Sequence, residues 1–421
     1  MTELTARELL VMLYETALDA VDGRYLVNQW CRDNQSLSSR QRSFTHCVAI
    51  GKAAAAMLQG AMDQSTSLKK ALLICPPSKI TRQLKKNTNI TCLASSHPVP
   101  DETSLAAGLS LVNFLSGMKS DDELLFLISG GTSSLVEIPL DNINLEQLQK
   151  INKYLLSSGK DIHQVNAWRQ QFSKIKGGGL LNWIKVSLIT QLLLSDVKDD
   201  KVEFIGSGLL VHSSTQPGPD EYLSALLAHN RRNAGSEESD MSEAKRSEST
   251  IHVDTHIIGT IRHAMQAAHV AAQAQGLDSF LHDEFIEGDA CLVANKLYTM
   301  LDNAAPGIHI WGGETTVRLP EKTGVGGRNL TLALAFADYI ADRPGLHLLA
   351  AGTDGVDGNA NCAGAIVSMY TAKKAKTMGF DIKLEIEKAN AGMVLMATDD
   401  LVNGAHSHTN VMDIFIAYKT D

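Results

Sequence analysis

Residues 124–135, LLFLISGGTSSL, place a continuous apolar run directly before two glycines and three hydroxyl residues. Such a run is typical of a strand buried on both faces of a parallel sheet. Gly130 and Gly131 permit positive φ and expose main-chain N–H groups, and the hydroxyl residues that follow can cap a helix or bond a phosphate. A capped helix start without a ligand explains one hydroxyl but not three. The stretch therefore predicts a strand ending in a loop whose backbone closely approaches a ligand.

Four other apolar runs of the first half resemble this strand. They are continuous rather than alternating, and helical segments lie between several of them, which predicts a parallel sheet with right-handed crossovers. The runs are THCVAIG (45–51), KKALLIC (69–75), ITCLASSH (90–97) and VSLITQLLLSDV (186–197). Before them, residues 5–21 carry apolar side chains at helical spacing and predict an amphipathic helix packed on a core.

A polar stretch interrupts this rhythm at residues 230–250, NRRNAGSEESDMSEAKRSEST. Its serines and charges favour an exposed loop or a partly disordered connection, with a polar helix face as the alternative. Helical periodicity then returns at residues 256–277, and strand-like runs follow at GIHIWGG (307–313), LHLLAAGTDG (346–355) and VMDIFIAYK (411–419). We expect two α/β domains, residues 1–235 and residues 236–421, which agrees with the 421-residue length.

The composition is that of a globular protein, with 44% hydrophobic and 20% charged residues. A formal net charge of -9 argues against a nucleic-acid surface, which would show clustered lysines and arginines. The six cysteines form no C-x-x-C pair, and most lie within or beside apolar runs, where we expect buried, reduced thiols. Neither a signal peptide nor a membrane-spanning run is recognisable. We expect a cytoplasmic protein with small-molecule partners and no membrane or nucleic-acid partner.

Lys52 follows the run at 45–51 and stands at the start of an alanine-rich helix, GKAAAAM. A cation is disfavoured beside the N–H groups of a helix start, whereas an anion is attracted there. The motif is not a Walker A loop, because His46 and Ala53 stand where that pattern needs Gly and Ser or Thr. Lys52 is therefore either a solvated surface lysine or part of an anion site, and we favour the anion site.

A polar helix face is predicted within HQVNAWRQQFSKIKGGG. Asn166, Arg169, Ser173 and Lys176 are spaced by three, four and three residues, which places an amide, a guanidinium, a hydroxyl and an amine on one face. That face is too polar for a core. It is either a solvated surface or a binding face, and the spacing alone leaves both open.

The second half adds an arginine and two aspartates among glycines. Arg328 begins a helix after GVGG, where it can bind a phosphate or carboxylate, although Asn329 breaks the G-x-G-x-x-G dinucleotide fingerprint. Asp354 and Asp357 follow a buried strand and could hold Mg²⁺ together with water and phosphate. With Asp196 after LLLS, these strand ends supply the cations and carboxylates that phosphoryl transfer needs.

Eight motifs resemble the class II glycerate kinase family, also called the glycerate 2-kinase or MOFRL family, in the family's order along nearly the whole chain. They are GKAAAAM, SHPVPDE, LISGGTSSL, SSGKDIHQVNAWRQQFSKIKGGGL, LLLSDV, GGETTVRL, GGRNLTLALA and LLAAGTDGVDG. The resemblance implies a pair of α/β domains, the first Rossmann-like, with the active site in the cleft between them. It also implies ATP- and Mg²⁺-dependent phosphorylation of D-glycerate to 2-phosphoglycerate.

Site residues follow from the resemblance position by position. The motifs match catalytic groups at Lys52, Asp196, Arg328 and Asp354, with Asp196 and Asp354 facing each other across the cleft and serving the metal. They match substrate- or phosphate-binding groups at Ser129, Gly130, Gly131, Thr132, Ser133, Asn166, Arg169, Lys176 and Glu314.

The chain departs from the family pattern at four places. Thr132 replaces a usual third glycine, residues 207–210 read SGLL instead of SGPT, and Ile261 replaces a usual Asn. Residues 404–410 read GAHSHTN where GPTGTN is usual. We therefore expect nucleotide handling to survive and the acceptor pocket to differ. A hydroxypyruvate or hydroxy-acid oxidoreductase, and a family member with altered acceptor or lost activity, stay as alternatives.

Overall fold

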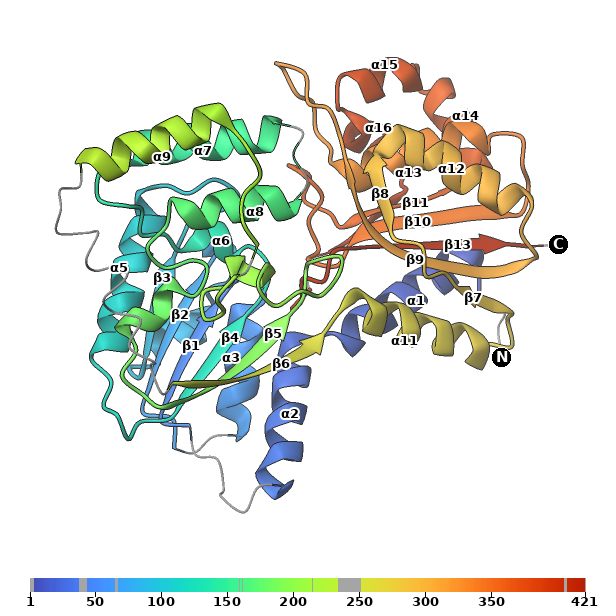
Figure 1. The fold of residues 1–421 in the computed structure, drawn as a ribbon. Coiled ribbons are helices and arrows are strands. Elements are labelled where there is room, and N and C mark those ends of the chain that lie inside the picture. The colour runs from blue at the N-terminus through green and yellow to red at the C-terminus, as the bar shows by residue number, and fades with distance from the viewer. Residues whose placement is uncertain are drawn as a thin grey trace. The chain divides into compact units, whose positions relative to one another are not determined.

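The structure is a computed structural model, and it describes residues 4–37, 44–64, 67–158, 160, 162–213, 215–233, 251–404 and 407–420. The chain forms two compact units (Figure 1). We call Leu26–Ile258 the parallel-sheet unit, and Met1–Tyr25 together with Gly259–Asp421 the mixed-sheet unit. Most of the polar stretch at 230–250 lies outside the described residues, so the prediction of a loop there is not tested.

The parallel-sheet unit contains six parallel strands in the order β3-β2-β1-β4-β5-β6. These are β1 (His46–Ile50), β2 (Lys70–Cys75), β3 (Ile90–Ala94), β4 (Leu124–Ile128), β5 (Leu188–Leu194) and β6 (His252–Gly259). Their order is that of a Rossmann fold. The predicted Rossmann-like first domain is confirmed.

Both faces of this sheet are covered, which explains why its central strands, β1 and β4, are almost entirely apolar. Val48 and Ile50 of β1 pack with Leu111 of α5, whereas Cys47 and Ala49 point to the opposite face. The unit's helices are α2 (Gly23–Leu37), α3 (Ala54–Gln64), α4 (Arg82–Lys86), α5 (Glu102–Ser116), α6 (Thr132–Leu135), α7 (Leu145–Ser157), α8 (Ile162–Gln171) and α9 (Glu221–Asn233), with short 3₁₀ turns η1 (Pro77–Lys79), η2 (Gly179–Trp183) and η3 (Ile205–Ser207).

The mixed-sheet unit is built on the strand order β12-β11-β10-β13-β9-β7, and β8 also pairs with β9. Its strands are β7 (Ser279–Leu281), β8 (Ile286–Asp289), β9 (Gly307–Thr316), β10 (Leu346–Gly352), β11 (Gly364–Ser368), β12 (Leu401–Val402) and β13 (Asp413–Lys419). β13 runs antiparallel to both β9 and β10, which brings the start of β13 beside the ends of these two strands.

Helices cover both faces of the mixed sheet. Trp311 of β9 packs in a core with α12 and α13, while the neighbouring Gly312 faces Ile261 and Met265 of α11. The helices are α1 (Ala6–Ala20), α11 (Ile261–Ala274), α12 (Ala290–Asp302), α13 (Arg328–Tyr339), α14 (Met369–Thr377), α15 (Ile382–Glu387) and α16 (Ala391–Ala397). The predicted fold of two α/β domains is therefore confirmed.

The compact units differ from the expected division at residue 235 in two respects. The predicted N-terminal helix forms as α1, but it belongs with the C-terminal half, where the Tyr14 hydroxyl donates to the carbonyl of Gly352 at 2.7 Å and Arg7 donates to the carbonyl of Leu401 at 2.8 Å. β6, which lies beyond the polar stretch, joins the edge of the parallel sheet. Long-range pairing, which local composition does not encode, causes both differences.

Candidate active site

The order of the parallel sheet reverses between β1 and β4. The chain builds β2 and β3 on one side of β1, and then returns to build β4, β5 and β6 on the other. In open α/β sheets, ligands bind at such a reversal, beyond the carboxyl ends of the strands. The loop with Lys52 follows β1 and the loop with Gly130 and Gly131 follows β4, so two predicted segments meet at this point.

The two loops touch along their backbones. The main-chain N–H of Lys52 donates to the carbonyl of Gly130 at 2.9 Å, and that of Ala53 donates to the Ser129 hydroxyl at 3.0 Å. Gly51 has φ +129°, and a Cβ there would lie 2.1 Å from the Ser129 Oγ. A glycine is therefore required at 51, because the chain is both left-handed and crowded there. Ser129 fixes the loop and is fully buried.

The hydroxyls of the β4 loop bond to protein atoms. Thr132 Oγ1 donates to the carbonyls of Ile50 at 3.0 Å and Ser129 at 2.8 Å, and Ser133 Oγ lies 2.7 Å from Ser207 Oγ. Gly131, with φ +88°, precedes the short α6. Within the described residues, the main-chain N–H groups of 130–133 have no protein acceptor. The loop therefore offers its amides, rather than its hydroxyls, to a ligand.

The predicted four-residue helix face is wrong in its second half. α8 ends at Gln171, because Ser173 pairs with Pro139 and the N–H of Lys174 donates to the carbonyl of Ile138. Only Asn166 and Arg169 share a helix face. Ser173 and Lys176 lie in the turn beyond it.

Lys176 forms a buried ion pair with Glu137. The Lys176 ammonium and the Ser173 hydroxyl both donate to the Glu137 carboxylate, and the two charged side chains are 2% and 1% exposed. Burial lowers the pKa of Lys176, and the neighbouring Glu137 carboxylate opposes that shift. The charge of Lys176 is thus already matched inside the protein, which weakens its predicted role as a phosphate ligand.

Arg169 is held by a different neighbour. Its Nε donates to Asn152 Oδ1 at 3.0 Å, and Asn152 in turn donates to the carbonyl of Leu148. Burial lowers the pKa of the Arg169 guanidinium, and the charge of Glu137 partly offsets that shift.

Asp196 follows β5, at the edge of the sheet where the loops after β1 and β4 lie. It is half-buried, while the adjacent Ser195 is buried.

In the mixed-sheet unit, Arg328 begins α13 and bonds two carboxylates. Its Nε and Nη2 donate to both oxygens of Asp413 at 2.6 and 3.0 Å, and its Nη1 lies 2.9 Å from Glu314 Oε1. Burial by itself lowers the pKa of Arg328, but the charges of Asp413 and Glu314 outweigh it and raise the pKa overall. Burial also raises the pKa of Asp413. Arg328 and Glu314, both predicted, therefore pair with each other, and Arg328 also bonds Asp413, which was not predicted.

The two aspartates after β10 have different surroundings. Asp354 is half-buried, and its Oδ1 accepts from the N–H of Val356 at 3.1 Å. Asp357 is 2% exposed and accepts from the N–H groups of Asn329 and Leu330 at 3.1 and 2.8 Å, so it caps the start of α13. Burial raises the pKa of Asp357 to about 6. Asp357 therefore serves the helix, and Asp354 is the better metal candidate.

Sequence reasoning missed Glu137, Asp413 and Tyr14. Each of the two carboxylates interrupts an apolar run, LVEIPL and VMDIF. A lone carboxylate in such a run must be buried with a partner, since an unpaired buried charge is costly. That signal could have found both residues, although not their partners. Tyr14 gave no signal beyond its place on an apolar helix face.

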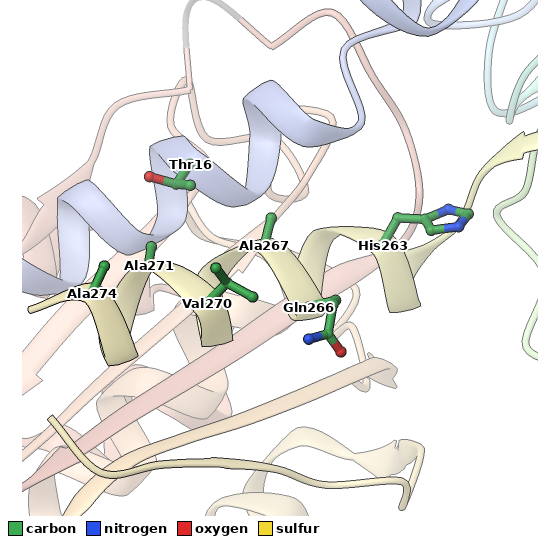
Figure 2. Close-up of a pocket in the computed structure, with 7 residues that line it drawn as sticks. All are labelled: Thr16, His263, Gln266, Ala267, Val270, Ala271 and Ala274. Carbon is green, nitrogen blue, oxygen red and sulfur yellow. The ribbon is translucent and has the colours of Figure 1, made fainter. Parts of the chain in front are cut away.

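Metal and membrane features are sparse in the described residues. They hold no cluster of three or more His, Cys, Asp or Glu side chains suited to a metal ion, and no described helix has the length and apolarity to cross a membrane. The six cysteines are free, as expected. One open pocket of the mixed-sheet unit, between α1 and α11, contains none of the predicted site residues (Figure 2).

Comparison with known proteins identifies the family. A family model described as a domain of unknown function, DUF4147, matches residues 9–233, and the MOFRL family model matches residues 307–413. The D-glycerate 2-kinase of Thermotoga maritima is 30% identical over 381 residues, 88% of this chain and 89% of that protein. The chain belongs to the class II glycerate kinase, or MOFRL, family, as the motifs predicted.

Two further comparisons bear on fold and name. The crystal structure of a glycerate kinase from Thermotoga maritima superimposes with a TM-score of 0.80 at 26% identity, covering 98% of this chain and 99% of that one. A protein of Agrobacterium vitis named a putative hydroxypyruvate reductase is 30% identical over 334 residues, 77% of this chain and 87% of that protein.

Proposed function

We propose that the protein is an ATP-dependent glycerate 2-kinase that converts D-glycerate to 2-phosphoglycerate. The observation that carries this proposal is the meeting of Lys52 with the amides of 130–133, which have no acceptor among the described residues, at the β1–β4 reversal. The chain is also 30% identical to a D-glycerate 2-kinase. A cation beside several free N–H groups suits the phosphates of a nucleotide. The failed G-x-G-x-x-G pattern disfavours the oxidoreductase alternative.

In the proposed reaction, the C2 hydroxyl oxygen of glycerate bonds to the γ-phosphorus of ATP. The bond from that phosphorus to the β,γ-bridging oxygen breaks, ADP leaves, and the hydroxyl proton is lost to a base. Lys52 and the loop amides hold the phosphate oxygens and stabilise their negative charge. Arg328 supplies a second positive charge for the same purpose. Asp413 and Glu314 fix the direction of that guanidinium.

The carboxylates suit Mg²⁺, which prefers one or two protein carboxylates plus phosphate oxygens to a closed protein cage. Asp196 and Asp354 would hold it, since each follows a strand end and is half-buried. Asp357 does not fit that role, because its oxygens accept from the start of α13. The ion would neutralise phosphate charge when bound.

The departures from the family pattern bear on the acceptor. Ile261 is buried against Gly312 of β9, Ser407 donates to the carbonyl of Thr353, and His408 pairs with Asp22 at 3.0 Å. His406 lies outside the described residues. Each described departure makes a contact within the protein, which favours ordinary use of glycerate. The loss of polar groups that are usual in the family instead favours a raised KM for glycerate or a preference for a related hydroxy acid.

We also propose that the protein works in the cytoplasm. Its six free cysteines suit a reducing compartment.

The test compares two reactions under matched conditions. ADP release is measured with ATP, Mg²⁺ and a panel of small hydroxy acids, and NADH or NADPH oxidation is measured with hydroxypyruvate. We expect ADP release that depends on D-glycerate, and no nicotinamide oxidation. Oxidation without ADP release would establish the reductase instead. Nucleotide binding without either reaction would indicate a family member that has lost its activity.

A further inference from the structure

On one face of α8, the Asn166 amide and the two terminal nitrogens of Arg169 have no protein partner among the described residues. Asn166 is 5% exposed, and within the described residues its amide makes no hydrogen bond. Arg169, one turn further along, uses only its Nε, and within the same residues its two terminal nitrogens have no acceptor. A buried amide without a partner, and a guanidinium whose terminal nitrogens lack acceptors, are costly unless a ligand or water satisfies them.

The charge around this face is unbalanced. Arg169 and Lys176 bring two positive charges, and among the described residues Glu137 is the carboxylate that interacts with both. Glu137 is committed to Lys176 and Ser173 by direct hydrogen bonds. One positive charge, that of Arg169, is therefore left for an anion.

The neighbours of Arg169 fix its direction. The side chain of Asn152, on α7, accepts from Nε and is itself held by the bond that it donates to the carbonyl of Leu148, one turn earlier in α7. Holding the guanidinium at Nε leaves Nη1 and Nη2 for a second contact, with the two parallel N–H donors that match a carboxylate. Asn166 adds an amide that can both donate to and accept from a hydroxyl.

We propose that Asn166 and Arg169 form the subsite that binds the carboxylate end of the acceptor, a small 2-hydroxy acid, with Arg169 on the carboxylate and Asn166 on an adjacent oxygen. This proposal rests on the kinase function proposed above. It assigns Glu137 and Lys176 to a supporting pair rather than to ligand contact. Asn152 is a positioning residue for Arg169.

The first experiment measures steady-state kinetics of the full chain and of R169Q, R169K and N166A. We expect the KM for D-glycerate to rise about a hundredfold in R169Q, about tenfold in R169K, which keeps the charge but loses the fork, and about tenfold in N166A. The KM for ATP should stay within about twofold, because the proposed subsite contacts the acceptor and not the nucleotide. The control is R262Q, which removes an exposed arginine paired with Asp283 and should change neither KM.

The outcomes separate the two anions of the reaction. A raised KM for ATP with an unchanged KM for glycerate in R169Q would overturn the proposal and assign Arg169 to nucleotide phosphate. Unchanged values for both substrates would overturn it as well.

A second measurement needs no variant to fold and no turnover. Saturation-transfer NMR on the wild-type chain compares D-glycerate and D-lactate with glycerol and the methyl ester of D-glycerate, which lack the carboxylate. We expect binding of the two acids and at least tenfold weaker binding of the two neutral compounds, because the charge-assisted contact is lost. Equal binding of acids and neutral analogues would contradict the subsite. Selective acid binding without ADP release would leave the subsite supported and refute the kinase function.

Discussion

Polar groups at the strand ends of the two sheets differ in what they bond. In the parallel-sheet unit, the amides of 130–133 have no described protein partner. In the mixed-sheet unit, Arg328 bonds Asp413 and Glu314, and Asp357 bonds the start of α13. The first edge is open to a ligand, whereas the second is held together by its own charges. Changes at the first edge should therefore cost turnover, and changes at the second should also cost stability.

The largest effect is expected for Arg328→Met. The buried Asp413 then loses its partner, so the free energy of unfolding should fall by about 3–5 kcal/mol in urea titration. R328M/D413L should recover most of that stability, because no buried charge is left unpaired. It should not recover turnover, because the guanidinium is still absent. The control R343M removes a half-exposed pair with Asp302 and should cost less than about 1 kcal/mol. An R328M protein as stable as wild type would remove the contrast between the two edges.

Lys52→Ala tests the open edge. We expect kcat to fall about a hundredfold or more, as for loss of one preorganised charge contact. The protein should still fold, because alanine keeps the main-chain N–H that Lys52 donates to the carbonyl of Gly130. K150A, on an exposed helix pair, is the matched control. Near-normal turnover in a folded K52A would refute the phosphate role.

Asp357→Asn sharpens the comparison through pH. Burial raises the pKa of Asp357 to about 6, above the value near 4 expected in the unfolded chain. The folded state thus binds this proton more tightly, and the resulting stability is full below pH 4 and lost as pH rises through 6. D357N lacks that loss, so its stability relative to wild type should rise by about 2 kcal/mol between pH 4 and pH 7. In the control D342N, which changes an exposed aspartate, stability should vary with pH as in wild type. If the stability of D357N ran parallel to that of wild type across this pH range, the pKa of Asp357 would not be raised.

The smallest effect is expected for Tyr14→Phe. This change leaves the buried carbonyl of Gly352 without its donor and should lower the free energy of unfolding by about 1 kcal/mol. Y25F, which alters an exposed tyrosine, should have no measurable effect. If the two variants proved equally stable, the bond that ties α1 to the end of β10 would contribute nothing.

Local sequence predicted the sheets and the loops but not the partners. Continuous apolar runs identified five of the six strands of the parallel sheet, and the glycines after β4 marked the open loop. β6 was missed, and its last residues lie in the segment at 256–277 that was predicted to be helical. Asp413 lies 85 residues from Arg328 along the chain, and Glu137 lies 39 residues from Lys176. Pairing at such distances depends on the fold. For the same reason, the spacing of Asn166 and Arg169 was informative, while the end of α8 was set by pairing with Pro139 and could not be read from spacing.

The most direct test of the proposed kinase activity is the identity of the product from ATP, Mg²⁺ and D-glycerate labelled with ¹³C at C2. Coupling between ¹³C and ³¹P reports which oxygen carries the phosphate. The proposed mechanism predicts a new ester on the C2 oxygen, formed in equal amount with ADP. A phosphate on the C3 oxygen, or ADP formed without any phosphorylated glycerate, would contradict it.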